Sequence, residues 1–153
     1  MPEITTFLTY NDQAEAAARL YVSIFEGNSR ITSTMPGPNG SVFGLTFELL
    51  GKTFFALNGG PSFKFSEAFS IFVSCDTQAE IDHYWSRLSE DGGKESQCGW
   101  LVDKFGVSWQ ITPKNLGSML GNKDQAKSSR AMQAMMQMKK FDIAALERAF
   151  NGS

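Results

Sequence analysis

The stretches Asn11-Asp12-Gln13-Ala14-Glu15 and Cys75-Asp76-Thr77-Gln78-Ala79-Glu80 occupy the same point of a repeated pattern. Each follows a short apolar segment of strand character and opens an amphipathic helix. After each helix comes a glycine turn, at Gly27 and at Gly92-Gly93, and then segments typical of antiparallel strands. The order strand, helix, strand, strand, strand therefore occurs twice, which predicts two modules that share one fold.

The repeat predicts an α+β protein with one βαβββ module over about residues 1–60 and a second over 66–113. The seam between them falls at Asn58-Gly59-Gly60-Pro61. Asp12 with Glu15, and Thr77 with Glu80, have the spacing of a capping box, so the two helices are expected to begin there. Period-two alternation and turn residues place strands over 4–10, 30–34, 43–50, 53–58, 68–75, 100–103 and 107–112.

Residues 114–153 are expected to form a helical C-terminal extension, with helices over about 116–120, 124–138 and 143–150. Five of the seven methionines lie in this extension. A methionine-rich helix surface is adaptable enough to bind partners, but packing in the core or in a dimer is the simpler interpretation.

Charge and hydropathy exclude several classes of partner. The chain has 14 basic and 16 acidic residues, a formal charge of −2, so no broad positive field indicates a nucleic-acid partner. No apolar run approaches the roughly 18 residues that span a bilayer, and no leader-like segment opens the sequence. We therefore expect a soluble, cytoplasmic protein that binds neither nucleic acid nor membrane.

Few side chains are suited to nucleophilic chemistry. Cys75 and Cys98 belong to no CxxC pair and are expected to be free thiols, with Cys98 the better candidate for a reactive one. The only histidine, His83, is predicted to face solvent from the second helix. Asp103, in the final hairpin, is expected to be an exposed turn carboxylate rather than a general base.

Five runs of sequence together resemble a known family. They are Leu57-Asn58-Gly59-Gly60-Pro61, Phe69-Ser70-Ile71-Phe72-Val73-Ser74-Cys75, Gln97-Cys98-Gly99-Trp100, Phe105-Gly106-Val107-Ser108-Trp109-Gln110-Ile111-Thr112-Pro113 and Met138-Lys139-Lys140. With the paired modules, they resemble the PhnB-like branch of the vicinal oxygen chelate superfamily, which includes glyoxalase I, extradiol dioxygenases and bleomycin-resistance proteins. The resemblance implies mixed sheets that curl around a cleft, and a homodimer in which modules from different chains can pair.

The resemblance also implies where metal ligands would lie. Metal-dependent relatives carry His, Gln or Glu at positions that match Thr5, Ser70 and Gln110 here. Hydroxyls are poor ligands for a divalent cation, and a neutral amide is weaker than a carboxylate. We therefore expect no metal and no cofactor, and keep an atypical divalent-metal site at Gln110 as the alternative.

The cleft that the resemblance implies is interpreted as a small-molecule site. Its candidate lining residues are Asn58, Ser70, Trp100, Trp109 and Gln110, although strand alternation prevents Trp109 and Gln110 from facing the same side without a bulge. The first hypothesis is a metal-independent homodimer that binds or sequesters a small organic molecule. The alternatives are a lyase, isomerase or dioxygenase of the superfamily with an atypical metal site, and a purely structural dimer.

The label 3-demethylubiquinone-9 3-methyltransferase, often given to this branch, is not favoured by the residues. Adenosylmethionine enzymes of the doubly wound type need a glycine-rich turn between a strand and a helix, and Gly59-Gly60-Pro61 precedes no predicted helix.

Overall fold

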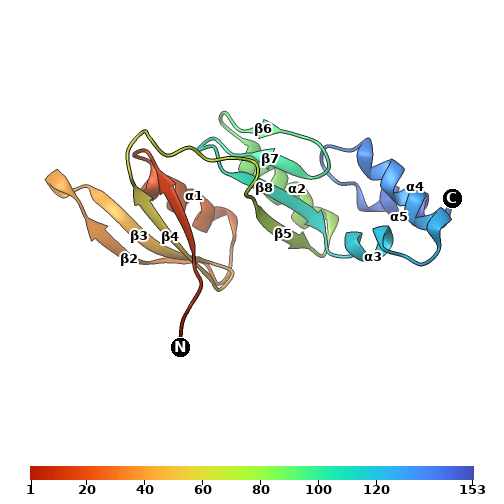
Figure 1. Cartoon of the computed structure of the whole chain (residues 1–153), viewed down its shortest axis with the longest axis horizontal. Coiled ribbons are helices and arrows are strands. Elements are labelled where there is room, and N and C mark those ends of the chain that lie inside the picture. The colour runs from red at the N-terminus through yellow and green to blue at the C-terminus, as the bar shows by residue number, and fades with distance from the viewer. The chain divides into compact units, whose positions relative to one another are not determined.

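The computed structural model describes all 153 residues and divides into two compact units, residues 1–64 and residues 65–153. Each unit contains one four-stranded mixed sheet with a helix packed against it (Figure 1). The α+β class and the duplicated βαβββ order predicted from the sequence are confirmed, and neither sheet is closed into a barrel.

The first unit contains β1 (Thr6–Tyr10), α1 (Ala14–Ile24), β2 (Arg30–Pro36), a 3-10 turn η1 (Pro38–Gly40), β3 (Val42–Leu49) and β4 (Lys52–Asn58). Its strand order is β1-β4-β3-β2, with β1 and β4 parallel and the other pairs antiparallel. Strand alternation turns Phe54 inward and Phe55 outward. Helix α1 presents Tyr21 to the inner face, where Phe47 stacks on Phe54 with 5.3 Å between ring centroids.

The start of α1 differs from the prediction. Gln13 occupies the N-cap position without a side-chain bond, so the predicted capping box of Asp12 and Glu15 is wrong. Glu15 instead pairs with Arg19 at 2.8 Å, one turn along the helix. The backbone amide of buried Ala14 donates to Oδ1 of Asn58, 2.9 Å away at the end of β4. A residue distant in sequence therefore satisfies the helix start.

The second unit contains β5 (Ile71–Cys75), α2 (Gln78–Ser89), β6 (Lys94–Glu95), β7 (Trp100–Val102) and β8 (Ser108–Pro113). Its strand order, β5-β8-β7-β6, repeats that of the first unit, again with one parallel pair, β5 and β8. The capping box of Thr77 and Glu80 is confirmed at the start of α2. Ile81, Trp85 and Leu88 of α2 are buried against one face of this sheet.

The hairpin between β7 and β8 is built around a buried carboxylate. Asp103 is only 2% exposed, so its predicted solvent exposure is wrong. Its oxygens accept hydrogen bonds from the backbone amides of Phe105 and Val107 and from the indole of Trp109, all at 2.9–3.0 Å. These three hydrogen bonds stabilise the charged carboxylate and offset the free-energy cost of removing it from water. Asp103 thus fixes the turn and the orientation of Trp109.

Helices α3 (Leu116–Leu120), α4 (Gln125–Met136) and α5 (Ile143–Asn151) belong to the second unit. Asp124 and Asp142 cap α4 and α5 with their side chains. Only Met119 of the five methionines is buried, whereas Met132 and Met136 are exposed. The helix positions agree closely with the periodicity of the sequence, and none of the helices is long and apolar enough to cross a membrane.

The segment between α4 and α5 anchors the extension to the module. The amides of Cys98 and Gly99 donate to the carbonyls of Met138 and Lys139, both at 2.8 Å. The Gln78 side chain donates to the carbonyl of Phe141 and accepts from the amide of Ile143. The loop before β7 is therefore held directly by the C-terminal extension.

Candidate functional site

The open face of the second sheet, opposite α2, gathers polar and aromatic side chains in one row. Gln110 on β8 pairs in register with Phe72 on β5 and with Trp100 on β7. Residues in register on neighbouring strands project from the same face. Phe72 is exposed, and Trp100 and Gln110 are half-buried, so all three line a solvent-accessible surface.

Ser70 extends this row by a hydrogen bond. It lies directly before β5, and its hydroxyl oxygen accepts from Nε2 of Gln110 at 2.9 Å. The bond fixes the Gln110 side chain across two strands and leaves the amide oxygen of Gln110 and the hydroxyl hydrogen of Ser70 for another partner. The sequence predicted both residues for the site, and the structure brings them together.

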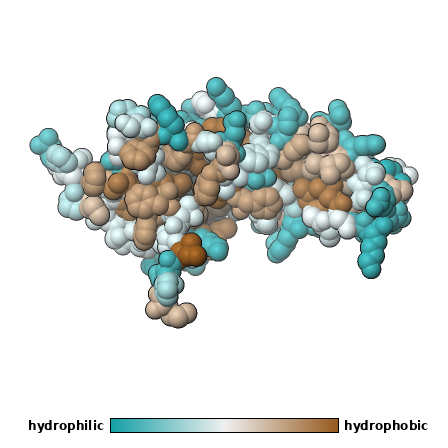
Figure 2. All heavy atoms as spheres, in the orientation of Figure 1, coloured by the Kyte–Doolittle hydropathy of each residue, from teal (hydrophilic) through white to brown (hydrophobic).

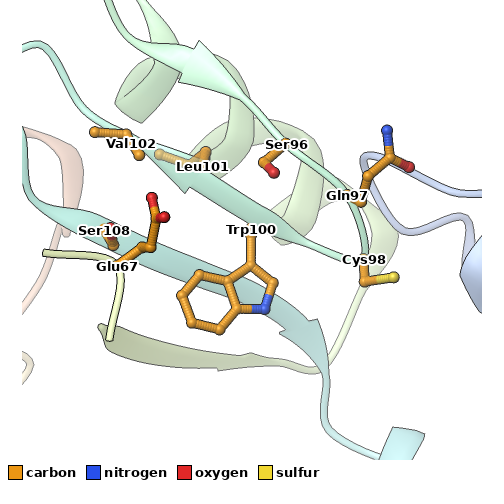
Figure 3. A pocket seen from close by; sticks show the side chains of 8 residues that line it. All are labelled: Glu67, Ser96, Gln97, Cys98, Trp100, Leu101, Val102 and Ser108. Atoms are coloured by element: carbon orange, nitrogen blue, oxygen red, sulfur yellow. The ribbon is translucent and has the colours of Figure 1, made fainter. Parts of the chain in front are cut away.

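A cavity of about 550 Å³ opens on the same face, around Trp100. Figure 3 shows the Trp100 indole lying across the sheet, with the Glu67 carboxylate rising from the segment before β5 near Ser108. The lining residues are Glu67, Ser96, Gln97, Cys98, Trp100, Leu101, Val102 and Ser108. A volume of this size accommodates a small organic molecule.

The other two predicted residues do not line this cavity. Trp109 is completely buried on the opposite face of β8, where its indole donates to Asp103, so it belongs to the core. Asn58 belongs to the first unit, where its side chain joins Ala14 to the carbonyl of Val42. Thr5, which matches a metal-ligand position of relatives, also belongs to the first unit and is half-buried before β1.

Sequence reasoning missed most of the cavity wall. Val102 and Ser108 could have been found, because they stand two residues from Trp100 and Gln110 and so share their face. Glu67, Ser96 and Gln97 lie outside the strands, where no periodicity indicates which way a side chain points.

The two thiols differ in environment. Burial, with the nearby charges of Glu80 and Asp76, raises the pKa of the Cys75 thiol to about 12. Cys75 is therefore protonated at neutral pH and unsuited to nucleophilic attack. Cys98 lines the cavity, and its Sγ lies 3.6 Å from the carbonyl oxygen of Met135. His83, predicted to face solvent, is half-buried on α2 beside the ring of Tyr84.

The donors present do not fit a divalent metal ion. Ser70 and Gln110 supply a hydroxyl and a neutral amide, and these two groups bond to each other. Nowhere in the chain do three His, Cys, Asp or Glu side chains gather in a group that could hold a metal.

The first unit carries a second cavity, of about 480 Å³, on the open face of its own sheet. Its aromatic walls are Phe7 and Phe55, whose rings pack edge to face with 6.1 Å between centroids. Met35 and Leu57 add further apolar surface. In Figure 2, apolar side chains gather over the strands of this unit.

Comparison with known proteins defines the family. Residues 2–112 match the family model described as 3-demethylubiquinone-9 3-methyltransferase. Among solved structures, a PhnB protein from Bacillus cereus is 33% identical, with 72% of this chain and 99% of that chain covered and a TM-score of 0.66. This chain belongs to that PhnB-like family, within the vicinal oxygen chelate superfamily that its motifs and paired βαβββ modules indicate.

More distant structures share the fold. Protein PA1353 from Pseudomonas aeruginosa is 18% identical, with a TM-score of 0.59 and 74% of this chain and 98% of that chain covered. A gene product from Arabidopsis thaliana is 17% identical, with a TM-score of 0.50 and 74% of this chain and 98% of that chain covered. No match was found among curated proteins.

Proposed function

We propose that this protein binds a small organic molecule on the open face of its second sheet without the aid of a metal ion. The observation that carries the proposal is the cavity of about 550 Å³ around Trp100, on the same face as the bonded pair Ser70 and Gln110. The Trp100 ring supplies apolar area that a ligand can cover, and the neighbouring amide and hydroxyl groups supply orientation.

The donor chemistry supports metal independence. The positions that hold ligands in metal-dependent relatives carry Thr5, Ser70 and Gln110, none of which provides a charged or imidazole donor. The alternative, an enzyme of the lyase, isomerase or dioxygenase type, would need an atypical metal site built on Gln110. A stoichiometric divalent ion in protein purified without chelator, and lost in Gln110→Ala, would favour that alternative.

A methyltransferase activity has no structural support from the chain. The glycine-rich Gly59 and Gly60 turn opens no helix, and both sheets are small and mixed rather than doubly wound and parallel. We therefore do not extend the activity in the family description to this protein.

A homodimer is part of the proposal. The open face of the first sheet exposes Phe7, Met35 and Phe55, an apolar surface of the kind that a second copy covers. Sedimentation velocity on the full chain should give a dimer, and Phe55→Ser should shift it toward monomer, whereas Phe63→Ser, in the link after β4, should not. A monomeric wild-type chain would contradict this part.

A fragment screen tests the binding function. Nitrogen-15-labelled full-length protein has three tryptophan indole signals, of which Trp85 and Trp109 are bonded to Glu95 and Asp103. We expect fragments that bind in the presence of chelator to shift the Trp100 signal and to lose affinity in Trp100→Leu. Phe63→Leu is the control, because Phe63 is exposed and does not line the cavity, and it should leave the affinity unchanged. Trp85 is not suitable for this purpose because it lies in the core. A screen with no Trp100 shift would contradict the proposal.

A further inference from the structure

The cavity around Trp100 has an unbalanced charge. Among its eight lining residues Glu67 is the only ionisable residue apart from Cys98, and no lysine, arginine or histidine lines it. The Glu67 side chain is exposed, and its carboxylate makes neither an ion pair nor a hydrogen bond within the chain. A carboxylate without a partner beside a ligand-sized cavity attracts a positive group.

Trp100 adds a second attraction of the same sign. Its half-buried indole lies across the open face of the sheet (Figure 3), and the face of an indole is the best aromatic partner for an organic cation. Two independent features of one cavity, a carboxylate and an electron-rich ring, thus favour a ligand of positive charge.

The remaining polar groups are neutral and can hydrogen-bond to an amine. Ser96, Gln97 and Ser108 offer neutral oxygens that accept hydrogen bonds from an ammonium group. The nearest basic residue by register is Lys94, which pairs with Val102 across the sheet edge. Lys94 does not line the cavity, whereas Glu67 does.

We propose that the ligand of this cavity is an organic cation, an amine attached to an aromatic or apolar body, recognised by Glu67 and Trp100. The inference rests on the proposed binding function and adds the chemical class of the ligand. In this arrangement the ammonium group lies between the Glu67 carboxylate and the indole face, and the apolar body covers Leu101 and Val102.

Three probes of similar size but different charge test the proposal. They are 2-phenylethylammonium, its neutral isostere 2-phenylethanol and the anion phenylacetate, each titrated into labelled full-length protein while the Trp100 indole signal is followed. We expect the cation to bind about fivefold more tightly than the alcohol, and phenylacetate to bind more weakly than either. Glu67→Gln should reduce the preference for the cation to about twofold or less.

A matched variant controls for overall charge. Glu147→Gln removes the same charge from an exposed position on α5 of the same unit that does not line this cavity, and should leave the preference unchanged. Trp100→Leu should lower the affinity for the cation more than the affinity for the alcohol, because only the cation is attracted to the face of the indole ring.

The outcomes separate this inference from the function on which it rests. Equal affinities for cation and alcohol at Trp100 would overturn the cation proposal while leaving a small-molecule site, and stronger binding of phenylacetate would overturn it in favour of an anion site near Lys94. No Trp100 shift with any probe would also overturn it. The binding function itself fails only if the broader fragment screen yields no ligand at Trp100.

Discussion

Nε2 of Gln110 donates a 2.9 Å hydrogen bond to the hydroxyl oxygen of Ser70, joining β8 to the residue before β5 on the open face of the second sheet. The family resemblance places metal ligands at both positions, yet here the two side chains bond to each other. The bond converts two weak metal donors into a fixed polar edge beside Trp100, which lies in register with Gln110.

This pair gives the first prediction. Gln110→Ala removes the donor that orients Ser70. The affinity of fragments that shift the Trp100 signal should fall by about three- to tenfold, the range for one hydrogen bond. Because both side chains are half-buried, the urea midpoint should change little. Affinity titrations and urea unfolding of the same preparations measure the two effects. An unchanged affinity would remove the pair from the binding site.

The second prediction concerns Asn58. Asn58→Ala leaves the Ala14 amide and the Val42 carbonyl without their partner, and should destabilise the first unit by about 1–2 kcal/mol. Hydrogen exchange at the Ala14 amide should speed up accordingly. Asn11→Ala, an exposed asparagine whose side chain makes no hydrogen bond, is the control and should have little effect. Unaltered exchange at Ala14 would contradict the capping role.

The third prediction concerns pH. The pKa of the Cys75 thiol is raised from 9.0, the ordinary value for a cysteine, to about 12 in the folded chain. Above pH 9 the unfolded chain therefore loses the thiol proton while the folded chain keeps it. The stability that this thiol contributes is therefore complete below pH 9 and is lost as pH rises toward 12, by up to about 1.4 kcal/mol per pH unit.

Comparison with a variant isolates the thiol from other groups that titrate in this range. Cys75→Ala lacks the ionisation, so its stability should fall less steeply than that of the wild type between pH 9 and 11. Urea unfolding at several pH values measures the difference. Parallel pH profiles of the two proteins would contradict the shifted pKa.

The fourth prediction concerns the loop that carries the cavity. Gly99 has a φ of +81°, and a Cβ there would lie 2.7 Å from the carbonyl oxygen of Ile111 and against the ring of Phe141. Gly99→Ala should cost at least about 2 kcal/mol, through backbone strain and overpacking. Gly117→Ala, in α3 with no neighbouring atom within 4 Å, should be neutral or slightly stabilising. Similar urea midpoints for both variants would contradict this account of the anchor.

The fold was predictable because its signals are local and repeated. Helical stripes, turn glycines and period-two alternation depend on neighbouring residues, so both modules and the helices of the extension could be placed from the sequence. The capping box of Thr77 was predicted correctly for the same reason. That of α1 was not, because Asn58, 44 residues away, supplies the bond instead.

The site was predictable only in part. Ser70, Trp100 and Gln110 share one face of the second sheet, as strand alternation and the family pattern together indicated. Trp109 lies in the core, where its indole N–H donates a hydrogen bond to buried Asp103, and nothing local in the sequence indicates that Asp103 is buried. Glu67 is contributed by an irregular segment, whose side-chain direction depends on tertiary packing alone.

Metal-independent binding at Trp100 is the central claim, and a paired titration tests it most directly. The tightest fragment from the screen is titrated into chelator-treated protein and into protein supplemented with Mg²⁺ or Zn²⁺, while the Trp100 indole signal is followed. We predict the same dissociation constant in all three conditions. Binding that disappears in chelator and returns with one of the metals would contradict the claim.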